Sequence, residues 1–274
     1  MVVSFEHMDH DWLLTMLALR IDDRAFLKLI GKWLKAGVLE TDGAVIHPDS
    51  GTPQGGIVSP VLANLYLHHA LDLWFERVVK PRCRGEVLLC RYADDFVCAF
   101  RYRDDAERFF AVLPKRLAKF SLEVAPEKTQ LLRFSRFHPS MTRRVTFLGF
   151  ELYWFEDRGG TPRVMRRTAR KRLFGACGRI KDWIGSHRHL RGRDFIKGLN
   201  RRLLGHYNYY GLRGNSQALW RFYQWAVECA FKWLNRRGGK RRSFTWGAFS
   251  RALHRLGIAK PRITEQPHAP RVFA

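Results

Sequence analysis

Apolar residues recur at helical spacing near the start of the chain and predict two helices between residues 9 and 36. The polar run at residues 20–23 predicts a break between them. A longer helix is expected from Ser59 or Pro60, because the Gly- and Pro-rich residues 51–56 give way there to another periodic apolar segment.

Two short apolar runs, residues 87–92 and 96–100, flank the tripeptide Ala93-Asp94-Asp95. They predict a β-hairpin with two carboxylates at its tip. Residues 145–153 predict a further strand, and the later periodic segments predict helices at 165–185, 193–212, 216–237 and 243–256. The order of elements predicts an α+β fold followed by an all-α segment.

The positive charge of the chain is concentrated in its second part. Residues 1–150 hold 21 Lys and Arg against 18 Asp and Glu, whereas residues 151–274 hold 28 against 7, so the net charges are +3 and +21. A folded chain with a total net charge of +24 is expected to work against a polyanion, and nucleic acid is the leading candidate. An anionic membrane surface is the main competitor, but no short amphipathic anchor stands out.

No stretch of the sequence approaches the roughly 18 uninterrupted apolar residues that a membrane-spanning helix needs. The start of the chain also lacks the pattern of a signal peptide. A cytoplasmic protein of bacterial type, without a membrane partner, is therefore expected. The five scattered cysteines fit neither a disulfide framework nor a zinc site and are interpreted as reduced thiols.

The adjacent carboxylates Asp94 and Asp95 are the strongest candidate for chemistry. Like charges held close together repel, and such a pair persists most readily around a divalent cation such as Mg²⁺. Two such ions can stabilise the attacking and leaving oxygens of phosphoryl transfer. An Asp-Asp pair by itself is more often an ordinary acidic turn, so its neighbours must decide.

Four boxes in order carry the decision: Thr52-Pro-Gln-Gly-Gly-Ile-Val-Ser-Pro60, Tyr92-Ala-Asp-Asp95, Pro126-Glu-Lys-Thr129 and Phe147-Leu-Gly-Phe150. Together they resemble the reverse transcriptases encoded by group II introns. Residues 199–211 and 231–246 are similar to the maturase-specific segment of those proteins. The resemblance implies a reverse-transcriptase palm, an antiparallel sheet with packed helices, over residues 1–157. A helical thumb and maturase segment at 163–256 and a C-terminal tail at 257–274 follow.

The resemblance also implies roles for single residues. Asp94 and Asp95 would bind two Mg²⁺ ions together with the substrate, and Lys128 would lie near the departing pyrophosphate as a general acid. The incoming nucleotide would be contacted by Phe5, Gln54, Gly55, Tyr92 and Ala93. Phe5 corresponds to the aromatic residue that excludes a ribose 2′-OH.

One departure from the family pattern affects the expected activity. Relatives carry a third catalytic Asp about five positions before the aromatic residue that corresponds to Phe5. In this sequence the matching position of that Asp falls before Met1. We therefore expect an N-terminally truncated member whose fingers and first catalytic motif are largely missing, with little or no polymerase activity by the chain alone. The alternative is a non-catalytic maturase fragment that binds intron RNA and assists its folding and splicing.

Arginine- and lysine-rich segments follow the palm and are predicted to bind RNA phosphates. The candidates are Arg163, Arg166, Arg167, Arg170, Lys171, Arg172, Arg201, Arg202, Arg236 and Arg237. The spacing of the first six predicts that they lie on one helix. The resemblance implies group II intron RNA, primer DNA and dNTP as partners, and the function of an RNA-directed DNA polymerase and intron maturase of a mobile element.

Overall fold

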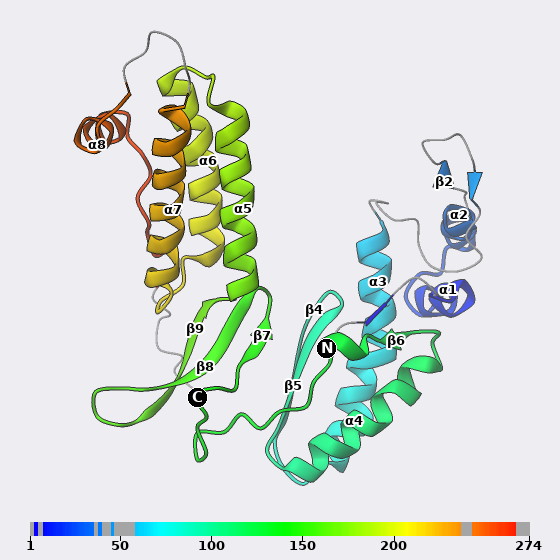
Figure 1. Ribbon diagram of the computed structural model, residues 1–274. Coiled ribbons are helices and arrows are strands. Elements are labelled where there is room, and N and C mark those ends of the chain that lie inside the picture. The colour runs from blue at the N-terminus through cyan, green and yellow to red at the C-terminus, as the bar shows by residue number, and fades with distance from the viewer. Residues whose placement is uncertain are drawn as a thin grey trace. The chain divides into compact units, whose positions relative to one another are not determined.

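The computed structural model describes residues 3–4, 8–35, 38–39, 45–46, 58–236 and 243–266. The chain forms two compact units, Met1–Arg133 and Phe134–Ala274, each with its own hydrophobic core. Figure 1 shows short antiparallel sheets packed with helices in the chain, as expected for an α+β fold. The boundary between the units lies earlier than the predicted palm limit at residue 157, because residues 145–168 form one sheet within the second unit.

The first unit begins with the two predicted helices, α1 (His10–Ala18) and α2 (Arg24–Lys35). Asp9 Oδ1 accepts hydrogen bonds from the backbone N–H groups of Asp11 and Trp12 at 2.8 and 3.0 Å and so caps α1. Asp23 caps α2 in the same way. The Asp23 cap sets the start of α2 and so accounts for the break between the two helices that the sequence predicted.

Helix α3 (Ser59–Leu67) is the predicted helix after the Gly- and Pro-rich loop. It continues through two π-helical turns, η1 (His68–Asp72) and η2 (Phe75–Val79), into the 3₁₀ turn η3 (Lys80–Arg82). Tyr66 is fully buried and donates a hydrogen bond to the carbonyl of Phe120 at 2.9 Å. Burial raises the pKa of Tyr66 to about 12, so its hydroxyl stays protonated as a donor.

The predicted hairpin is present as strands β4 (Val87–Tyr92) and β5 (Asp95–Phe100). Helix α4 (Arg103–Ala118) follows and packs against the hairpin. After it come β6 (Glu123–Val124) and the 3₁₀ turn η4 (Pro126–Lys128). Strand β6 pairs antiparallel with β1 (Val3–Ser4), and the short strands β2 (Val38–Leu39) and β3 (Val45–Ile46) pair with each other.

The second unit opens with the antiparallel sheet β7 (Val145–Phe147), β8 (Phe150–Glu156) and β9 (Pro162–Thr168). The prediction of one strand over 145–153 was wrong. Leu148 and Gly149 both have positive φ, 49° and 78°, which turns the chain back on itself. The Phe147-Leu-Gly-Phe150 box is therefore the tip of a hairpin and not the middle of a strand.

The prediction of a helix from residue 165 was also wrong at its start. Residues 162–168 form β9, which pairs along its whole length with β8, and α5 (Arg170–His187) begins only after it. The other expected helices are present as α6 (Gly192–Tyr210), α7 (Ser216–Leu234) and α8 (Trp246–Arg255).

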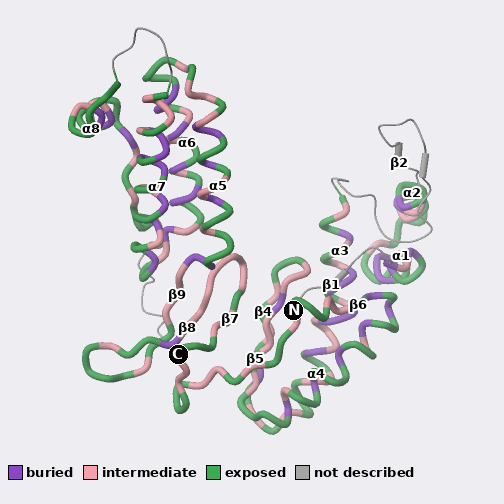
Figure 2. The backbone as a smooth tube through the Cα atoms, viewed as in Figure 1, coloured by how far each residue is buried: buried purple, intermediate pink, exposed green. Residues whose placement is uncertain are grey.

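Helices α5, α6 and α7 run side by side and bury a shared core, visible as the purple stretches in Figure 2. Fully buried Leu199, Leu203, Tyr207 and Leu219 lie at its centre. Asn215 joins this bundle to the sheet: its amide exchanges two hydrogen bonds of 2.8 Å with the backbone N–H and hydroxyl of Thr168. Because both residues are buried, this pair fixes the end of β9 to the start of α7.

Residues 257–266, the described part of the predicted C-terminal tail, are bound to the helical unit. The backbone N–H of Ala259 donates to Asn200 Oδ1 at 2.7 Å, and that of Thr264 to the carbonyl of Gly211 at 2.8 Å. Glu265 accepts two hydrogen bonds from Arg166 and one from the backbone of Arg213. This segment thus connects α6 with strand β9.

Candidate functional site

The hairpin tip carries the two carboxylates as the sequence predicted. Tyr92 pairs with Asp95 across the ladder, which leaves Ala93 and Asp94 as the two turn residues. Ala93 has a φ of 51°, a conformation that costs a non-Gly residue about 1 kcal/mol or more. Phe96 follows directly and is completely buried, so one end of the tip is anchored in the core of the first unit.

The side chain of Arg91 holds the hairpin tip in place through hydrogen bonds. Its guanidinium binds the Asp72 carboxylate at both oxygens, with Nε–Oδ1 and Nη2–Oδ2 distances of 2.8 and 2.6 Å. Its Nη1 donates to Asn64 Oδ1 at 2.8 Å and to the carbonyl of Ala93 at 3.0 Å. One side chain thus connects the strained turn to α3 and to the π-helical turn η1, and α3 begins next to the predicted nucleotide-binding loop.

Asp94 and Asp95 are half-buried, and neither side chain has a hydrogen bond or ion pair with the described residues. The pair therefore offers free carboxylate oxygens, the ligands that Mg²⁺ prefers. In the part of the chain that the structure describes, no group of three or more His, Cys, Asp or Glu side chains is arranged to hold a metal ion. The two carboxylates fit a metal that takes its other ligands from water and from substrate phosphates.

The remaining predicted catalytic and nucleotide-binding residues are placed only in part. Lys128 is exposed on η4, and no hydrogen bond or ion pair among the described residues joins it to the hairpin tip. Tyr92 is exposed beside the carboxylates. Phe5, Gln54 and Gly55 lie outside the described residues, as does Arg237 of the predicted RNA-binding set.

The predicted RNA-binding arginines fall into two groups in the second unit. Those on strand β9 are paired with carboxylates: Arg163 with Asp157 at 2.6 Å, Arg166 with Glu265 at 2.7 Å, and Arg167 with Glu151 at 2.9 Å. Hydrogen bonds from the backbone and from the paired arginine hold the pKa values of Asp157 and Glu265 below their usual range. Their spacing predicts that these three arginines share a helix with Arg170 to Arg172. That prediction was wrong, because the three lie on strand β9 and α5 begins only at Arg170.

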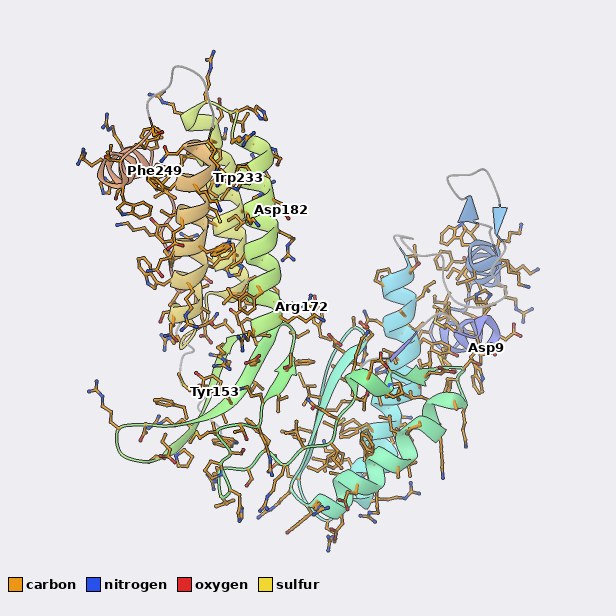
Figure 3. The ribbon with its side chains drawn as sticks, viewed as in Figure 1. Asp9, Tyr153, Arg172, Asp182, Trp233 and Phe249 are labelled. Atoms are coloured by element: carbon orange, nitrogen blue, oxygen red, sulfur yellow. The ribbon has the colours of Figure 1, made fainter. Side chains whose placement is uncertain are left out.

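The charged groups of the cations on the helices form no ion pair with a carboxylate of the described residues, although the backbone N–H of Arg170 donates to Glu151 Oε1 at 3.2 Å. They are exposed: Arg170, Lys171 and Arg172 in the first turn of α5, and Arg201 and Arg202 in the middle of α6. Figure 3 places Arg172 at the end of α5 next to the sheet. Arg202 lies over the ring of Trp183 with 4.1 Å to its centroid, and Arg236 lies 5.9 Å from that of Trp233. Such side chains are available to phosphate.

The aromatic residues of this unit also divide into two groups. Tyr207 is fully buried and its ring belongs to the bundle core. Tyr209, Trp220, Trp225 and Trp246 each leave about half of their surface exposed, from 42 to 54%. These exposed rings remain candidates for stacking on unpaired bases.

Sequence reasoning did not identify the Arg91–Asp72–Asn64 contact set. The sequence did contain one indication of these contacts: Arg91 lies in an otherwise apolar strand next to the Tyr92-Ala-Asp-Asp95 box, and a charge in such a place needs partners. Tyr209 was also missed as a support of the second hairpin: its hydroxyl donates to the carbonyl of Leu148 at 3.0 Å, and its ring stacks on Phe150.

Residues 3–152, more than half of the chain, match the family model of the reverse transcriptase, an RNA-dependent DNA polymerase. The chain belongs to the reverse transcriptase family. The match includes the hairpin with Asp94 and Asp95, and it confirms the α+β reverse-transcriptase fold expected from the four boxes.

Several relatives of this reverse transcriptase are intron proteins by name. The group II intron-encoded protein LtrA of Lactococcus lactis is 50% identical over 64 residues, which are 23% of this chain and 10% of LtrA. A 91 kDa protein in the cob intron of Schizosaccharomyces pombe is 46% identical over 74 residues, 27% of this chain and 9% of that protein. The protein YkfC of Escherichia coli is 30% identical over 118 residues, 34% of this chain and 31% of YkfC.

These alignments confirm the resemblance to group II intron proteins that the sequence boxes indicated. They span about a tenth of the length of the intron-encoded relatives. No helix among the described residues is long and apolar enough to cross a membrane.

Proposed function

We propose that this reverse transcriptase copies RNA into DNA at the hairpin of Asp94 and Asp95 and binds group II intron RNA through α5 and α6. The observation that carries the proposal is a pair of carboxylates that have no partner among the described residues and lie on a tip that Arg91 connects to α3. RNA, primer DNA and deoxynucleotides are the proposed partners.

In this proposal Asp94 and Asp95 would hold two Mg²⁺ ions, whose chemistry when bound would be to offset the negative charge of the nucleotide phosphates and to favour deprotonation of the primer hydroxyl. Arg91 keeps the tip in place, and its bond to the Ala93 carbonyl opposes relaxation of the strained turn. Tyr92, exposed next to the carboxylates, would contact the nucleotide. Lys128 would donate a proton to the departing pyrophosphate.

The carboxylate assignment is tested by metal binding and by primer extension on an RNA template. We expect Asp94→Asn and Asp95→Asn to weaken Mn²⁺ binding in the presence of template, primer and dNTP, and to reduce any DNA synthesis by about a hundredfold or more. Asp182→Asn, on the exposed face of α5, removes the same charge from a side chain that has no hydrogen bond or ion pair with the described residues, and it is the matched control (Figure 3). Unchanged Mn²⁺ binding by both hairpin variants would refute the assignment.

The same extension assay with the unmodified chain tests the expectation of little or no synthesis by the chain alone. Robust synthesis would overturn that expectation. If the chain binds intron RNA tightly but shows no synthesis, its function is that of the alternative, an RNA-binding maturase fragment. The unpaired arginines of α5 and α6 favour RNA binding under either outcome.

The RNA-binding surface is tested with two variants of equal charge change. One replaces Arg170, Lys171 and Arg172 with Gln; the other replaces Arg163, Arg166 and Arg167. We expect the first to reduce the slope of log affinity against log salt by about 2, because each phosphate contact contributes roughly 0.7 for single-stranded nucleic acid. The second should change the slope less, because carboxylates already neutralise those three arginines. Equal slope changes would contradict this division.

A further inference from the structure

A pocket in the second unit contains polar groups that the proposed polymerase chemistry does not use. It has a volume of about 320 Å³ and lies among α5, α6 and α7. Its walls are formed by Ala176, Arg179, Ile180, Arg202, His206 and Phe222. The volume is about ten times the space that one water molecule takes in the liquid, roughly 30 Å³, so a small charged group fits.

The buried wall of the pocket includes a histidine whose Nε2 has no hydrogen-bond partner among the described residues. His206 is 9% exposed, and its Nε2 is buried without a hydrogen bond. Burial, together with the nearby charge of Arg179, lowers the pKa of His206 to about 4, so the ring is neutral near pH 7. Leaving a buried polar nitrogen unpaired costs about 1–3 kcal/mol. A ligand atom that reaches Nε2 and forms a hydrogen bond with it would remove that cost.

Two exposed guanidinium groups stand at the pocket, from Arg179 on α5 and Arg202 on α6. Neither forms an ion pair with a described residue, in contrast to the arginines of β9. Arg202 is held in place by the ring of Trp183 and by a hydrogen bond of 3.2 Å to the carbonyl of Gly198. This leaves its other N–H groups free for an acceptor.

The aromatic rings of the pocket are already covered. Phe222 is 3% exposed and stacks on His206 at a centroid distance of 3.9 Å, while Tyr210 packs on the same histidine at 4.7 Å. No open ring face is offered here to a nucleobase. The available chemistry is two guanidinium donors and one neutral imidazole, which suits a phosphate.

We propose that Arg179, Arg202 and His206 form a phosphate-binding pocket that holds one backbone phosphate of the bound RNA. The inference rests on the proposed RNA-binding function and names a site within it. The arginines provide charge, and the neutral imidazole provides a hydrogen bond whose presence depends on close docking. An RNA phosphate would thereby be held between two neighbouring helices of the bundle.

The test measures RNA affinity by fluorescence anisotropy over a range of salt concentrations, with the full chain. We expect Arg179→Gln and Arg202→Gln to weaken binding about fivefold to tenfold and to reduce the salt slope by about 0.7 each. His206→Phe should weaken binding about threefold to tenfold without changing the slope, because a neutral group displaces no counterion. Arg251→Gln, an exposed arginine of α8, is the control for the loss of one charge.

Stability separates a ligand site from a structural role. His206→Phe keeps the stacking on Phe222 and removes an unpaired buried nitrogen, so its thermal midpoint should be unchanged or higher while RNA binding weakens. A lower midpoint with unchanged RNA affinity would overturn the proposal and assign His206 to packing. Because Arg179 and Arg202 are exposed, their variants remain informative if His206→Phe folds poorly.

Inorganic phosphate distinguishes the source of the ligand. If phosphate raises the midpoint of the unmodified chain but not of Arg179→Gln, while both bind RNA equally, the pocket takes a free anion and the RNA assignment is refuted. If the unmodified chain does not bind RNA, the proposed function fails together with this site. If the unmodified chain binds RNA and the pocket variants bind it with the same affinity, the proposed RNA-binding function stands and the pocket assignment alone fails.

Discussion

Arg91 is the residue whose replacement should most disturb the hairpin of Asp94 and Asp95. Its side chain is 13% exposed and donates four hydrogen bonds, to both Asp72 oxygens, to Asn64 and to the carbonyl of Ala93. Removing one partner of a buried pair costs about 3–5 kcal/mol, because the other charge is left uncompensated. Asp72 is 25% exposed and can regain some hydration, so the expected loss for Arg91→Met is near the lower limit, about 3 kcal/mol.

Arg91→Lys separates charge from geometry. A lysine keeps the attraction to Asp72 but has no planar fork, so it cannot bind both carboxylate oxygens and also reach Asn64 and Ala93. We expect about half of the loss, roughly 1.5 kcal/mol. The control is Arg82→Met, at an exposed arginine of the same unit whose side chain has no partner among the described residues. It should change stability by less than about 0.5 kcal/mol.

The assay is hydrogen exchange measured by mass spectrometry, supported by urea unfolding. Peptides covering residues 87–100 should lose protection in Arg91→Met, whereas peptides from α5 to α7 should exchange as before, because the second unit has its own core. In a double-mutant cycle, Arg91→Met and Asp72→Asn should show a coupling of at least about 1 kcal/mol. Additive effects, or unchanged protection of the hairpin, would refute the assignment of Arg91 as its support.

Two further predictions concern the second unit. Gly149→Ala should lower the free energy of unfolding by about 2 kcal/mol, because the position has a φ of 78° and a Cβ would lie 2.8 Å from the hydroxyl of Tyr210; Tyr210→Phe should recover about half of that loss in the double variant, and no recovery would contradict the steric reason. Glu265→Gln should cost about 1–2 kcal/mol at pH 7, since it weakens the contacts with Arg166 and with the backbone of Arg213. The folded-state pKa of Glu265 is lowered, so the stability that this carboxylate contributes is present above its unfolded-state pKa and is lost as pH falls through its folded-state pKa. Urea unfolding from pH 7 to pH 3 should therefore show the difference in free energy of unfolding between the unmodified chain and Glu265→Gln shrinking with acid. A constant difference would be the opposing result.

The sequence predicted the hairpin of Asp94 and Asp95 well because its signal is local. Two apolar runs of strand length flank the acidic turn, and the ladder pairs Tyr92 with Asp95 as such a pattern requires. The turn at Leu148 and Gly149 was missed because a two-residue hairpin with positive φ at both positions usually carries Asn or Asp first. A leucine there gives no turn signal, and contacts from Tyr209 and Tyr210, some sixty residues later, support the conformation.

The arginines of β9 show a different limit of sequence reasoning. Arg163, Arg166 and Arg167 have spacings that fit a helix together with the cations that follow, so the period alone does not exclude a helix. Pairing with β8 decides in favour of a strand, and the ion pair between Arg167 and Glu151 joins neighbouring strands directly. The partners of Arg91 were equally invisible, because Asn64 and Asp72 are 27 and 19 residues away in sequence.

Only part of the positive charge of the second unit is available to bind RNA. The arginines on the sheet are held by carboxylates and serve the fold, and Arg166 does so through Glu265 across 99 residues of sequence. The arginines on α5 and α6 lack such partners among the described residues and retain their full attraction for phosphate. Since each unit charge acts on RNA only where it is not already neutralised, the RNA-binding surface should follow the helices and not the sheet.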